Sequence, residues 1–193
     1  YPDMEKYIRP YVMGKDFIDR KPRYCFWLKG ASPADLKKCP DLIKRIEKVK
    51  EFRSTCKNDN TLETANTPTL PSMFRYYAHE FNSDFIAIPK VSSQRRRYIP
   101  MELLPSNYVA GDKIFLMPKS NKYTFGVMTS NVHMAWMRVL CGRLKSDYSY
   151  SSTIVYNTFP FPSPTETQKL KIEETAQAIL DARAKYPDSS LAD

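Results

Sequence analysis

The layout of this chain follows from residues 85–101, Phe85-Ile-Ala-Ile-Pro-Lys-Val-Ser-Ser-Gln-Arg-Arg-Arg-Tyr-Ile-Pro-Met101. The first five residues form an apolar run with the length and composition of a buried strand. A polar and basic segment follows at Val91–Arg97 and leads to an apolar exit. Turn residues such as Asn107, Gly111 and Asn121 then separate three further strand-like runs, predicted at Tyr98–Met101, Lys113–Met117 and Tyr123–Met128.

Two segments on either side of these runs have helical periodicity. Asp41–Thr55 repeats apolar residues at helical spacing directly after Pro40. A second helix is predicted to start at Ser130 or Asn131 and to continue through Leu144. The residues expected to face inward are Leu42, Ile43, Ile46, Val49 and Phe52 in the first helix and Val132, Trp136, Val139 and Leu140 in the second.

The C-terminal part of the chain predicts a third helix and differs in charge from the rest. Thr165 and Gln168 form a capping box whose helix runs to about Tyr186, where Pro187 stops it. From Ser163 onward there are four Lys/Arg and six Asp/Glu, a charge of −2, so the remainder of this chain of net charge +9 carries +11. A basic body with a mildly acidic tail fits a polyanion-binding domain followed by a protein-packing segment, although positive charge can also serve solubility alone. The inward residues of this helix are expected to be Leu170, Ala176, Ile179 and Leu180.

Other segments are predicted to be extended or irregular. Residues 1–22 mix aromatics, proline and charge, and are interpreted as extended segments joined at Gly14. Arg23–Leu28 predicts a strand, and Tyr148–Asn157 predicts an extended tract. Residues 57–73 are polar and broken by two prolines, which indicates a loop long enough to be functional.

The sequence carries no recognisable catalytic or metal-binding motif. Its four cysteines lack the short Cys/His spacing of a metal site, so reduced thiols are expected. The five glycines are not spaced as a nucleotide loop, and no Ser or Cys stands in a nucleophile motif. Asp84 and Lys90 flank a strand, but the second acid of a metal-dependent nuclease is missing, and His133 is expected to make a packing or polar contact. The lack of a secretory signal and of a long apolar run predicts a cytoplasmic protein without a membrane partner, and Tyr1 in place of Met suggests a piece of a larger protein.

The segment Val91–Arg97 has the chemistry of a base-reading element. The planar fork of Arg fits guanine O6 and N7, and Gln can pair with adenine N6 and N7 in the major groove. Arg also contacts phosphate, which positions a protein on DNA without reading sequence. A short extended segment with both residue types therefore favours base reading, and the alternative is a solvated, charge-rich turn.

Blocks along nearly the whole chain resemble the target recognition domain of MmeI-like DNA methyltransferases, which are single-chain type IIG/IIL restriction–modification proteins. These blocks are Tyr7–Ile18, Ile86–Met101, Thr124–Ser130, His133–Arg138, Cys141–Tyr148, Tyr156–Pro160 and Ile179–Asp193. The resemblance and the predicted elements together imply an α+β fold, with a mixed, mostly antiparallel sheet, flanking helices and a helical C-terminal extension. They place the recognition domain at residues 1–129 and a helical region that packs on it or links it at residues 130–193.

The resemblance also implies what surrounds this chain. In such enzymes an upstream domain uses S-adenosylmethionine to methylate adenine N6, and many members carry a nuclease domain. The Gly-rich cofactor loop and the Asn-Pro-Pro-aromatic motif of that domain are absent from this sequence. The implied partners are therefore double-stranded DNA in its major groove and, in the same polypeptide, the methyltransferase domain, with no cofactor bound by this chain.

Site residues follow from the same family. Its specificity positions lie in the segment that matches Ser93–Tyr98, which implies that Gln94 and Arg96 read one base pair together. Members often have Glu where this chain has Gln94, and Glu accepts from cytosine N4 whereas Gln suits adenine, so the target sequence should differ. A second recognition position is implied in the polar loop at roughly Thr61–Asn66. The candidate base-reading residues are Gln94, Arg95, Arg96, Arg97, Thr64 and Asn66, and the candidate contacts to the DNA backbone are Lys90, Ser92, Ser93, Arg143 and Lys145.

Several alternatives remain open on the sequence. Arg143 and Lys145 could cap the predicted helix 131–144 instead of meeting DNA. The tyrosines Tyr148, Tyr150 and Tyr156 could stack on a base, although packing is favoured, and Trp136, Met134 and Met137 are expected in the core. Two other functions compete with duplex reading, namely a scaffold that holds neighbouring domains and a single-stranded nucleic-acid binder whose stacking platforms would be Tyr76, Tyr77 and Phe81.

Overall fold

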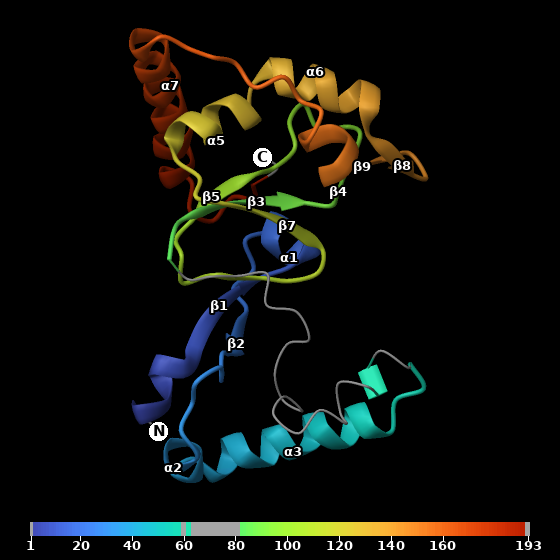
Figure 1. The fold of residues 1–193 in the computed structure, drawn as a ribbon, viewed down its shortest axis with the longest axis vertical. Coiled ribbons are helices and arrows are strands. Elements are labelled where there is room, and N and C mark those ends of the chain that lie inside the picture. The colour runs from blue at the N-terminus through green and yellow to red at the C-terminus, as the bar shows by residue number, and fades with distance from the viewer. Residues whose placement is uncertain (1, 59–60, 63–81, 192–193) are drawn as a thin grey trace. The chain divides into compact units, whose positions relative to one another are not determined.

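The computed structural model describes residues 2–58, 61–62 and 82–191 (Figure 1). These residues form two compact units. The first unit takes residues up to Arg9 and the described residues of 24–78, and the second takes residues 10–23 and the described residues from 82 onward.

The first unit contains the helix predicted after Pro40, namely α3 (Pro40–Ser54). Proline is well placed in a first helical turn because the N–H that it lacks would have no partner there. Leu42 is buried as expected and forms a small core with Met4, Leu28 and Cys39, but Phe52 is 66% exposed, so its inward assignment was wrong. Other described elements of this unit are η1 (Pro2–Tyr7), the start of β1 (Ile8–Val12), β2 (Tyr24–Phe26) and α2 (Pro33–Lys37).

The second unit is centred on β3 (Phe85–Pro89), the strand that the apolar run predicted. β3 pairs antiparallel with β5 (Glu102–Leu104) on one edge and with β7 (Ile114–Pro118) on the other. All five residues of β3 are buried. Side chains alternate across a strand, so a strand buried at every position must be covered on both faces of its sheet.

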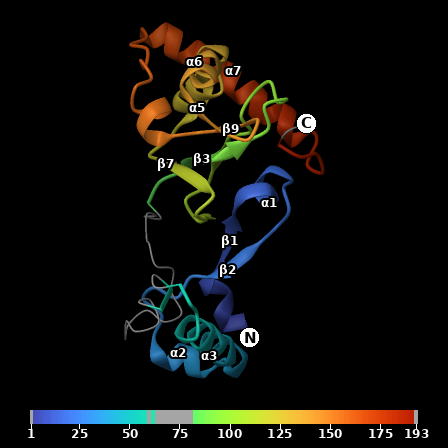
Figure 2. The same ribbon diagram turned by 90° about the vertical axis from the view of Figure 1, so that its right-hand side faces the viewer.

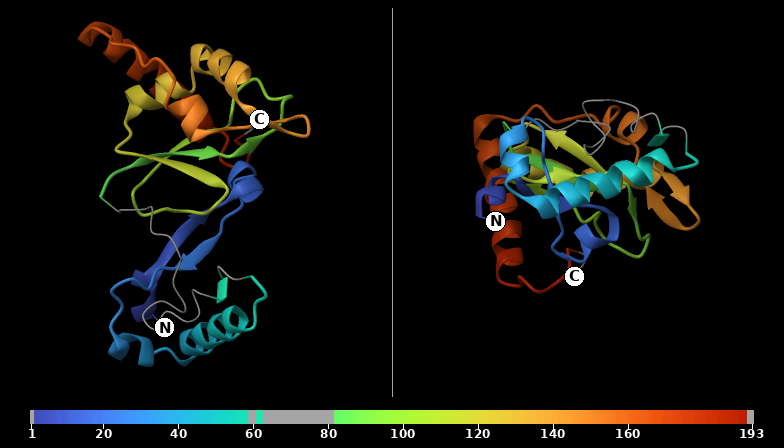
Figure 3. Two further views of the ribbon diagram at one scale, coloured as in Figure 1. Left: turned by 45° about the vertical axis from the view of Figure 1, so that its right-hand side comes forward. Right: turned by 90° about the horizontal axis from the view of Figure 1, so that it is seen from below.

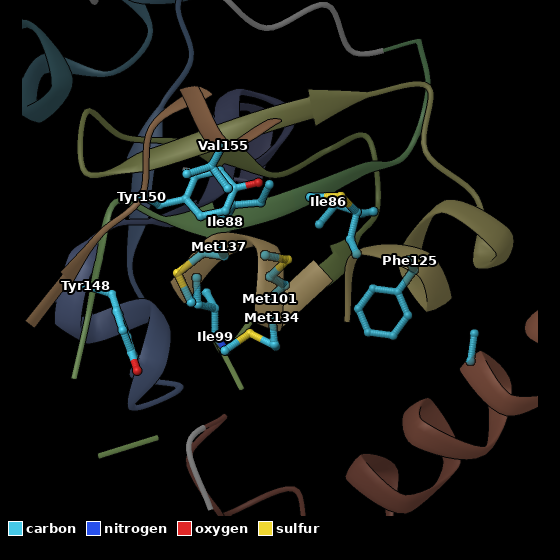
Figure 4. Packing of buried hydrophobic residues seen from close by; sticks show 12 residues of the cluster. Ile86, Ile88, Ile99, Met101, Phe125, Met134, Met137, Tyr148, Tyr150 and Val155 are labelled. Carbon is cyan, nitrogen blue, oxygen red and sulfur yellow. The ribbon is translucent and has the colours of Figure 1, made fainter. Parts of the chain in front are cut away.

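Two different cores cover these two faces. Ile86 and Ile88 belong to the first core, which α5 (Lys122–Met128), α6 (Asn131–Leu140) and α7 (Glu166–Ala184) close. The three helices lie together over the same side of the sheet (Figures 1 and 2). Figure 4 shows how Phe125, Met101, Met134, Met137 and Val155 fill the space between sheet and helices.

The second core is smaller and lies on the other face of β3. Phe85 and Ala87 meet Phe17 and Ile18 of α1 (Gly14–Ile18) there, and Leu191 at the end of the described chain also belongs to it. The end of β1 pairs parallel with β6 (Val109–Ala110) in the same unit. A third small sheet joins β4 (Val91–Ser92), β9 (Asp147–Ser149) and β8 (Gly142–Leu144) in the order β4-β9-β8. The predicted α+β fold, with mostly antiparallel strand pairing, flanking helices and a C-terminal helix, is confirmed, and its strands form three small sheets where one mixed sheet was expected.

The strand predicted at Tyr123–Met128 was wrong, because these residues form the helix α5. Asn121 starts this helix with a capping box, in which its side chain accepts from the backbone N–H of Thr124 at 2.9 Å and its own N–H donates to Thr124 Oγ1 at 2.9 Å. Gly126 brings α5 against α7 so closely that a Cβ at this position would lie 2.7 Å from Ile172 Cγ2. Capping and this close helix contact outweigh the strand-like composition.

Four other boundaries differ from the predictions. Tyr98–Met101 is not a strand, since β5 starts at Glu102, and residues 1–22 include η1 and α1 rather than extended segments alone. The extended tract from Tyr148 ends at Ser149, after which the side chain of Ser151 caps the π-helical turn η2 (Ser152–Tyr156). The helix predicted at 131–144 ends at Leu140.

The inward faces of two helices were also assigned partly wrongly. α6 buries His133, Met134 and Met137, whereas Val132 and Val139 are 70% and 81% exposed. In α7, Ala176 is buried as predicted but Leu170 is 58% exposed. The capping box at the start of α7 is confirmed, with Gln168 N donating to Thr165 Oγ1 at 3.3 Å and Thr165 N donating to Gln168 Oε1 at 2.9 Å.

Candidate nucleic-acid interface

The glutamine and three arginines lie in a turn that directly follows the two-residue strand β4. The backbone N–H of Arg96 donates to the carbonyl of Ser93 at 3.1 Å and so closes the turn. The expectation that an extended segment carries these side chains was therefore wrong, since the extended strand β4 ends at Ser92 and the turn follows it. Gln94, Arg95 and Arg97 are exposed, and Arg96 is half-buried. We call residues 93–97 the arginine turn.

A β-hairpin lies beside the arginine turn. β9 pairs with β4, with Tyr148 opposite Ser92, and it pairs with β8 through a tight turn at Lys145 and Ser146 (Figure 3, orange). The carboxylate Oδ1 of Asp147 accepts a hydrogen bond from the backbone N–H of Gln94 at 3.3 Å. This bond ties the arginine turn to the hairpin.

The hairpin carries Arg143 and Lys145, two of the three cations that the sequence predicted to contact the DNA backbone. Arg143 stands opposite Tyr148, with its guanidinium carbon 4.2 Å from the centre of the Tyr148 ring, and Nη1 donates to the carbonyl of Ser146 at 3.3 Å. Lys145 is exposed at the tip, with a positive φ of 57°. The alternative that the two residues cap a helix is wrong, because α6 ends at Leu140 and these residues belong to the hairpin.

Ser92 does not lie where a contact to the DNA backbone requires it. Its residue exposure is 3%, and its hydroxyl accepts a hydrogen bond from Nη1 of Arg96 at 3.4 Å. The buried hydroxyl of Ser92 therefore holds the guanidinium of Arg96 in position. Ser93 is half-buried and its hydroxyl accepts from the backbone N–H of Arg95 at 3.4 Å, while the Lys90 ammonium lies 4.8 Å from the centre of the Phe115 ring.

The residues after the arginine turn are fixed to α6. Arg138 Nη2 donates to the carbonyl of Arg97 at 2.7 Å, and the Tyr98 hydroxyl donates to Asn131 Oδ1 at 2.9 Å. The backbone N–H of Ile99 meets Met134 Sδ at 3.3 Å in the buried core. Hydrogen bonds to the rest of the fold therefore hold both ends of the arginine turn, and such contacts are needed to position exposed side chains precisely.

A cleft of about 970 Å³ opens next to Arg96 and Arg97 in the second unit. Two further arginines line it, Arg20 after α1 and Arg183 in α7. Arg20 donates to Glu102 Oε1 at 3.3 Å, and Arg183 Nη1 donates to the carbonyl of Met101 at 2.7 Å. Neither residue could be predicted as part of the site from the sequence, because Arg20 stands alone in a mixed segment and Arg183 belongs to the acidic tail.

Aromatic residues near the turn serve mainly as core. Tyr148 and Tyr150 are 7% and 4% exposed, which confirms packing over base stacking for these two. The Tyr150 hydroxyl lies 3.1 Å from Nε2 of His133, whose side chain is fully buried and meets Phe159 edge-on at 4.9 Å. Burial lowers the pKa of His133 to about 4 and raises that of Tyr150. The expected packing or polar role of His133 is confirmed.

The described part of the chain shows no group of three or more His, Cys, Asp or Glu residues that could hold a metal ion. All four cysteines are free, and burial raises the pKa of Cys25 to about 11 and also that of Cys141. A raised thiol pKa disfavours the nucleophilic thiolate. Within the same described residues no helix has both the length and the apolar character needed to cross a membrane.

Known proteins share this arrangement. Residues 1–163 match the family model described as the MmeI target recognition domain. The chain belongs to this family. A solved structure of the type IIL restriction–modification enzyme MmeI in complex with DNA superposes on this recognition domain with a TM-score of 0.88 and 40% identity, covering 99% of this chain and 25% of that one. The DNA methyltransferase A of Bacillus subtilis (strain 168) is 36% identical over 183 residues, 95% of this chain and 20% of the relative.

The chain thus spans a fifth of one relative and a quarter of the other. The family match ends before α7, so the helix that carries Arg183 lies beyond the matched residues. Thr64 and Asn66 lie outside the described residues, as do Tyr76, Tyr77 and Phe81.

Proposed function

We propose that this recognition domain reads a short DNA sequence in the major groove, as part of a longer restriction–modification methyltransferase that acts on adenine N6. The observation that carries the proposal is the exposed arginine turn, held at both ends by the fold and flanked by a basic hairpin. The major groove of B-form DNA is about 12 Å wide and admits a two-stranded ribbon, which matches the hairpin β8–β9 and its neighbouring turn.

Each residue of the site has a proposed role. Gln94 and Arg96 read one base pair, and Ser92 orients Arg96 from its buried position. Arg95 and Arg97 contact phosphate or a neighbouring base, and a second reading position is proposed at Thr64 and Asn66. The residues proposed to contact the DNA backbone are Lys90, Ser93, Arg143 and Lys145.

The methyl-transfer chemistry belongs, in this proposal, to the rest of the parent polypeptide in the bacterial or archaeal cytoplasm. The five glycines of this chain are not spaced to cradle a cofactor, and its described residues hold no group of three or more His, Cys, Asp or Glu that could bind a metal ion. We therefore assign S-adenosylmethionine to a methyltransferase domain elsewhere in the parent. Sequencing of modified sites in DNA from a host that expresses the full-length protein would give both the recognised motif and the methylated base.

Competition binding at fixed salt tests the reading function directly. The full-length protein is expected to prefer one short duplex, recovered from a randomised library, over random duplex and over single strands of the same sequence. Equal affinity for all three would contradict the proposal. Preference for the single strand would favour stacking on exposed aromatics instead, a role for which Tyr148 and Tyr150 are too deeply buried.

A further inference from the structure

The cleft beside the arginine turn gathers four guanidiniums from three separate parts of the chain. Arg96 and Arg97 come from the turn, Arg20 from the segment after α1, and Arg183 from α7. We call these four residues, with the cleft that they line, the arginine cleft.

Among the residues that the structure describes, acidic side chains do not balance the charges of the arginine cleft. Within the described residues, the one carboxylate bonded to these guanidiniums is Glu102, which pairs with Arg20. Arg183 donates to a backbone carbonyl and Arg96 to the hydroxyl of Ser92, and both of these acceptors are neutral. Arg97 lies with its guanidinium carbon 5.5 Å from the centre of the Tyr98 ring. In the part of the chain that the structure describes, four cations thus face one anion, Glu102.

The acidic residues of α7 do not correct this imbalance. The α7 residues that line the cleft are Thr175, Ile179, Ala182 and Arg183, so the acids of α7 are not part of its wall. Burial and the neighbouring Arg20 lower the pKa of Arg183, while Glu102 opposes the shift. Arg20, Arg96 and Arg183 are half-buried, and cations held together in this way are costly unless an anion joins them, so the cleft is suited to a polyanion.

We propose that the arginine cleft binds backbone phosphates of the duplex strand next to the base pair that Arg96 reads. This inference rests on the proposed function, because Arg96 belongs to both the turn and the cleft. Continuity with the turn favours DNA over a free anion, since a strand that passes the turn meets the cleft next. On this view α7, beyond the family match, adds a phosphate contact of its own through Arg183.

Charge variants in the full-length protein test the proposal with a randomised duplex, whose binding does not depend on base reading. Glu102→Gln removes the opposing charge but keeps an oxygen that Arg20 can bond. It is expected to tighten binding roughly twofold to fivefold, the range of a partly exposed charge pair. Arg20→Gln is expected to weaken binding by a similar factor and to reduce the slope of log K against log salt by about 1.

The opposite effects of the two variants separate a phosphate contact from a structural role, because a destabilised fold does not bind DNA more tightly. Thermal melting of both variants checks folding, which matters most for Arg183→Gln because the Arg183 guanidinium also packs 5.6 Å from the Phe125 ring. No change in duplex affinity for Glu102→Gln and Arg20→Gln would overturn the inference. Stabilisation by inorganic phosphate that both variants alter, with duplex affinity unchanged, would identify a free-anion site instead and would also overturn it.

The proposed function fails separately from this inference. If the wild-type protein preferred no duplex sequence, base reading would be wrong, yet the salt slopes of the cleft variants would still report phosphate binding. If the wild-type protein preferred one duplex sequence while the cleft variants left duplex affinity unchanged, phosphate binding by the cleft would be wrong and base reading would stand.

Discussion

The sheet around β3 and the sheet β4-β9-β8 lie in the same unit but are held together in different ways. β3 is buried at every position and sits between two cores. β4 has two residues, and β8 is exposed along its length. Polar contacts hold the turn of this second sheet, among them those that Asp147 and Arg138 make. The sheet around β3 therefore stabilises the fold, whereas the second sheet presents exposed side chains that could bind a partner. Substitutions in the first sheet should change stability, and substitutions in the second should change binding.

The largest effect is expected in the core. Phe125→Ala removes a fully buried ring from the first core and should lower the free energy of unfolding by about 3–5 kcal/mol, as measured by denaturant titration. The matched control is Val139→Ala on α6, where the side chain is 81% exposed and a change within about 0.5 kcal/mol is expected. Equal losses for both variants would mean that the cores do not carry the stability.

Acid should weaken the same core through His133. The folded pKa of about 4 lies below the unfolded value of about 6.5, so the unfolded chain binds more protons between these two values. Stability is therefore fully present above pH 6.5 and is lost as the pH falls toward 4, by up to about 3 kcal/mol. Unfolding followed by tryptophan fluorescence across this window measures the slope.

His133→Gln provides the control for that slope. This variant is expected to be less stable at pH 7, because it disturbs the contacts with Tyr150 and Phe159, but to show a flatter dependence on pH between 4 and 6.5. An unchanged slope would assign the acid sensitivity to other groups.

The arginine turn should show the reverse pattern, with altered recognition and unaltered stability. Gln94→Glu and Arg96→Gln are expected to change the preferred base pair by about 1–3 kcal/mol of discrimination, read from competition among duplexes that differ at one position. Their unfolding free energies should stay within about 0.5 kcal/mol of the parent. Arg143→Gln and Lys145→Gln serve as controls that weaken all duplexes evenly. A uniform loss from the Gln94 and Arg96 variants would refute base reading by this pair.

A smaller effect is expected from the bond between the turn and the hairpin. Asp147→Ala removes the acceptor of the Gln94 N–H and should cost about 1 kcal/mol of specific duplex binding. Asp147→Asn keeps an acceptor oxygen while it removes the charge, so it should restore the preference for the cognate duplex. If the two variants behaved alike, the charge of Asp147 rather than its hydrogen bond would matter.

Elements with a strong local signal could be predicted from the sequence. The apolar run of β3, the periodicity of α3 and the Thr165–Gln168 capping box each act within a few residues, and all three are confirmed. α5 was missed because its residues have strand-like composition, and its helix depends on the Asn121 cap and on the contact of Gly126 with α7. The latter contact is a tertiary one that the sequence does not display.

The site shows the same division between local and distant information. The Arg and Gln cluster stands out in the sequence because its members are adjacent. The exposure of the turn depends on short strands whose pairing with β9 crosses many residues. Arg20 and Arg183 come together only when α1 and α7 have packed on the two sides of the central sheet. Family resemblance supplied the roles of Gln94 and Arg96, which residue chemistry alone left open between reading and solvation.

Lys145 has a consequence for how the hairpin can vary. Its left-handed backbone, at φ 57°, is a conformation that costs a residue with a Cβ about 1–2 kcal/mol and that glycine adopts freely. Glycine would therefore adopt this conformation at the tip with less strain than lysine. A glycine at this position would relieve the backbone strain at the tip of the hairpin, but it would remove the ammonium that we propose to contact the DNA backbone.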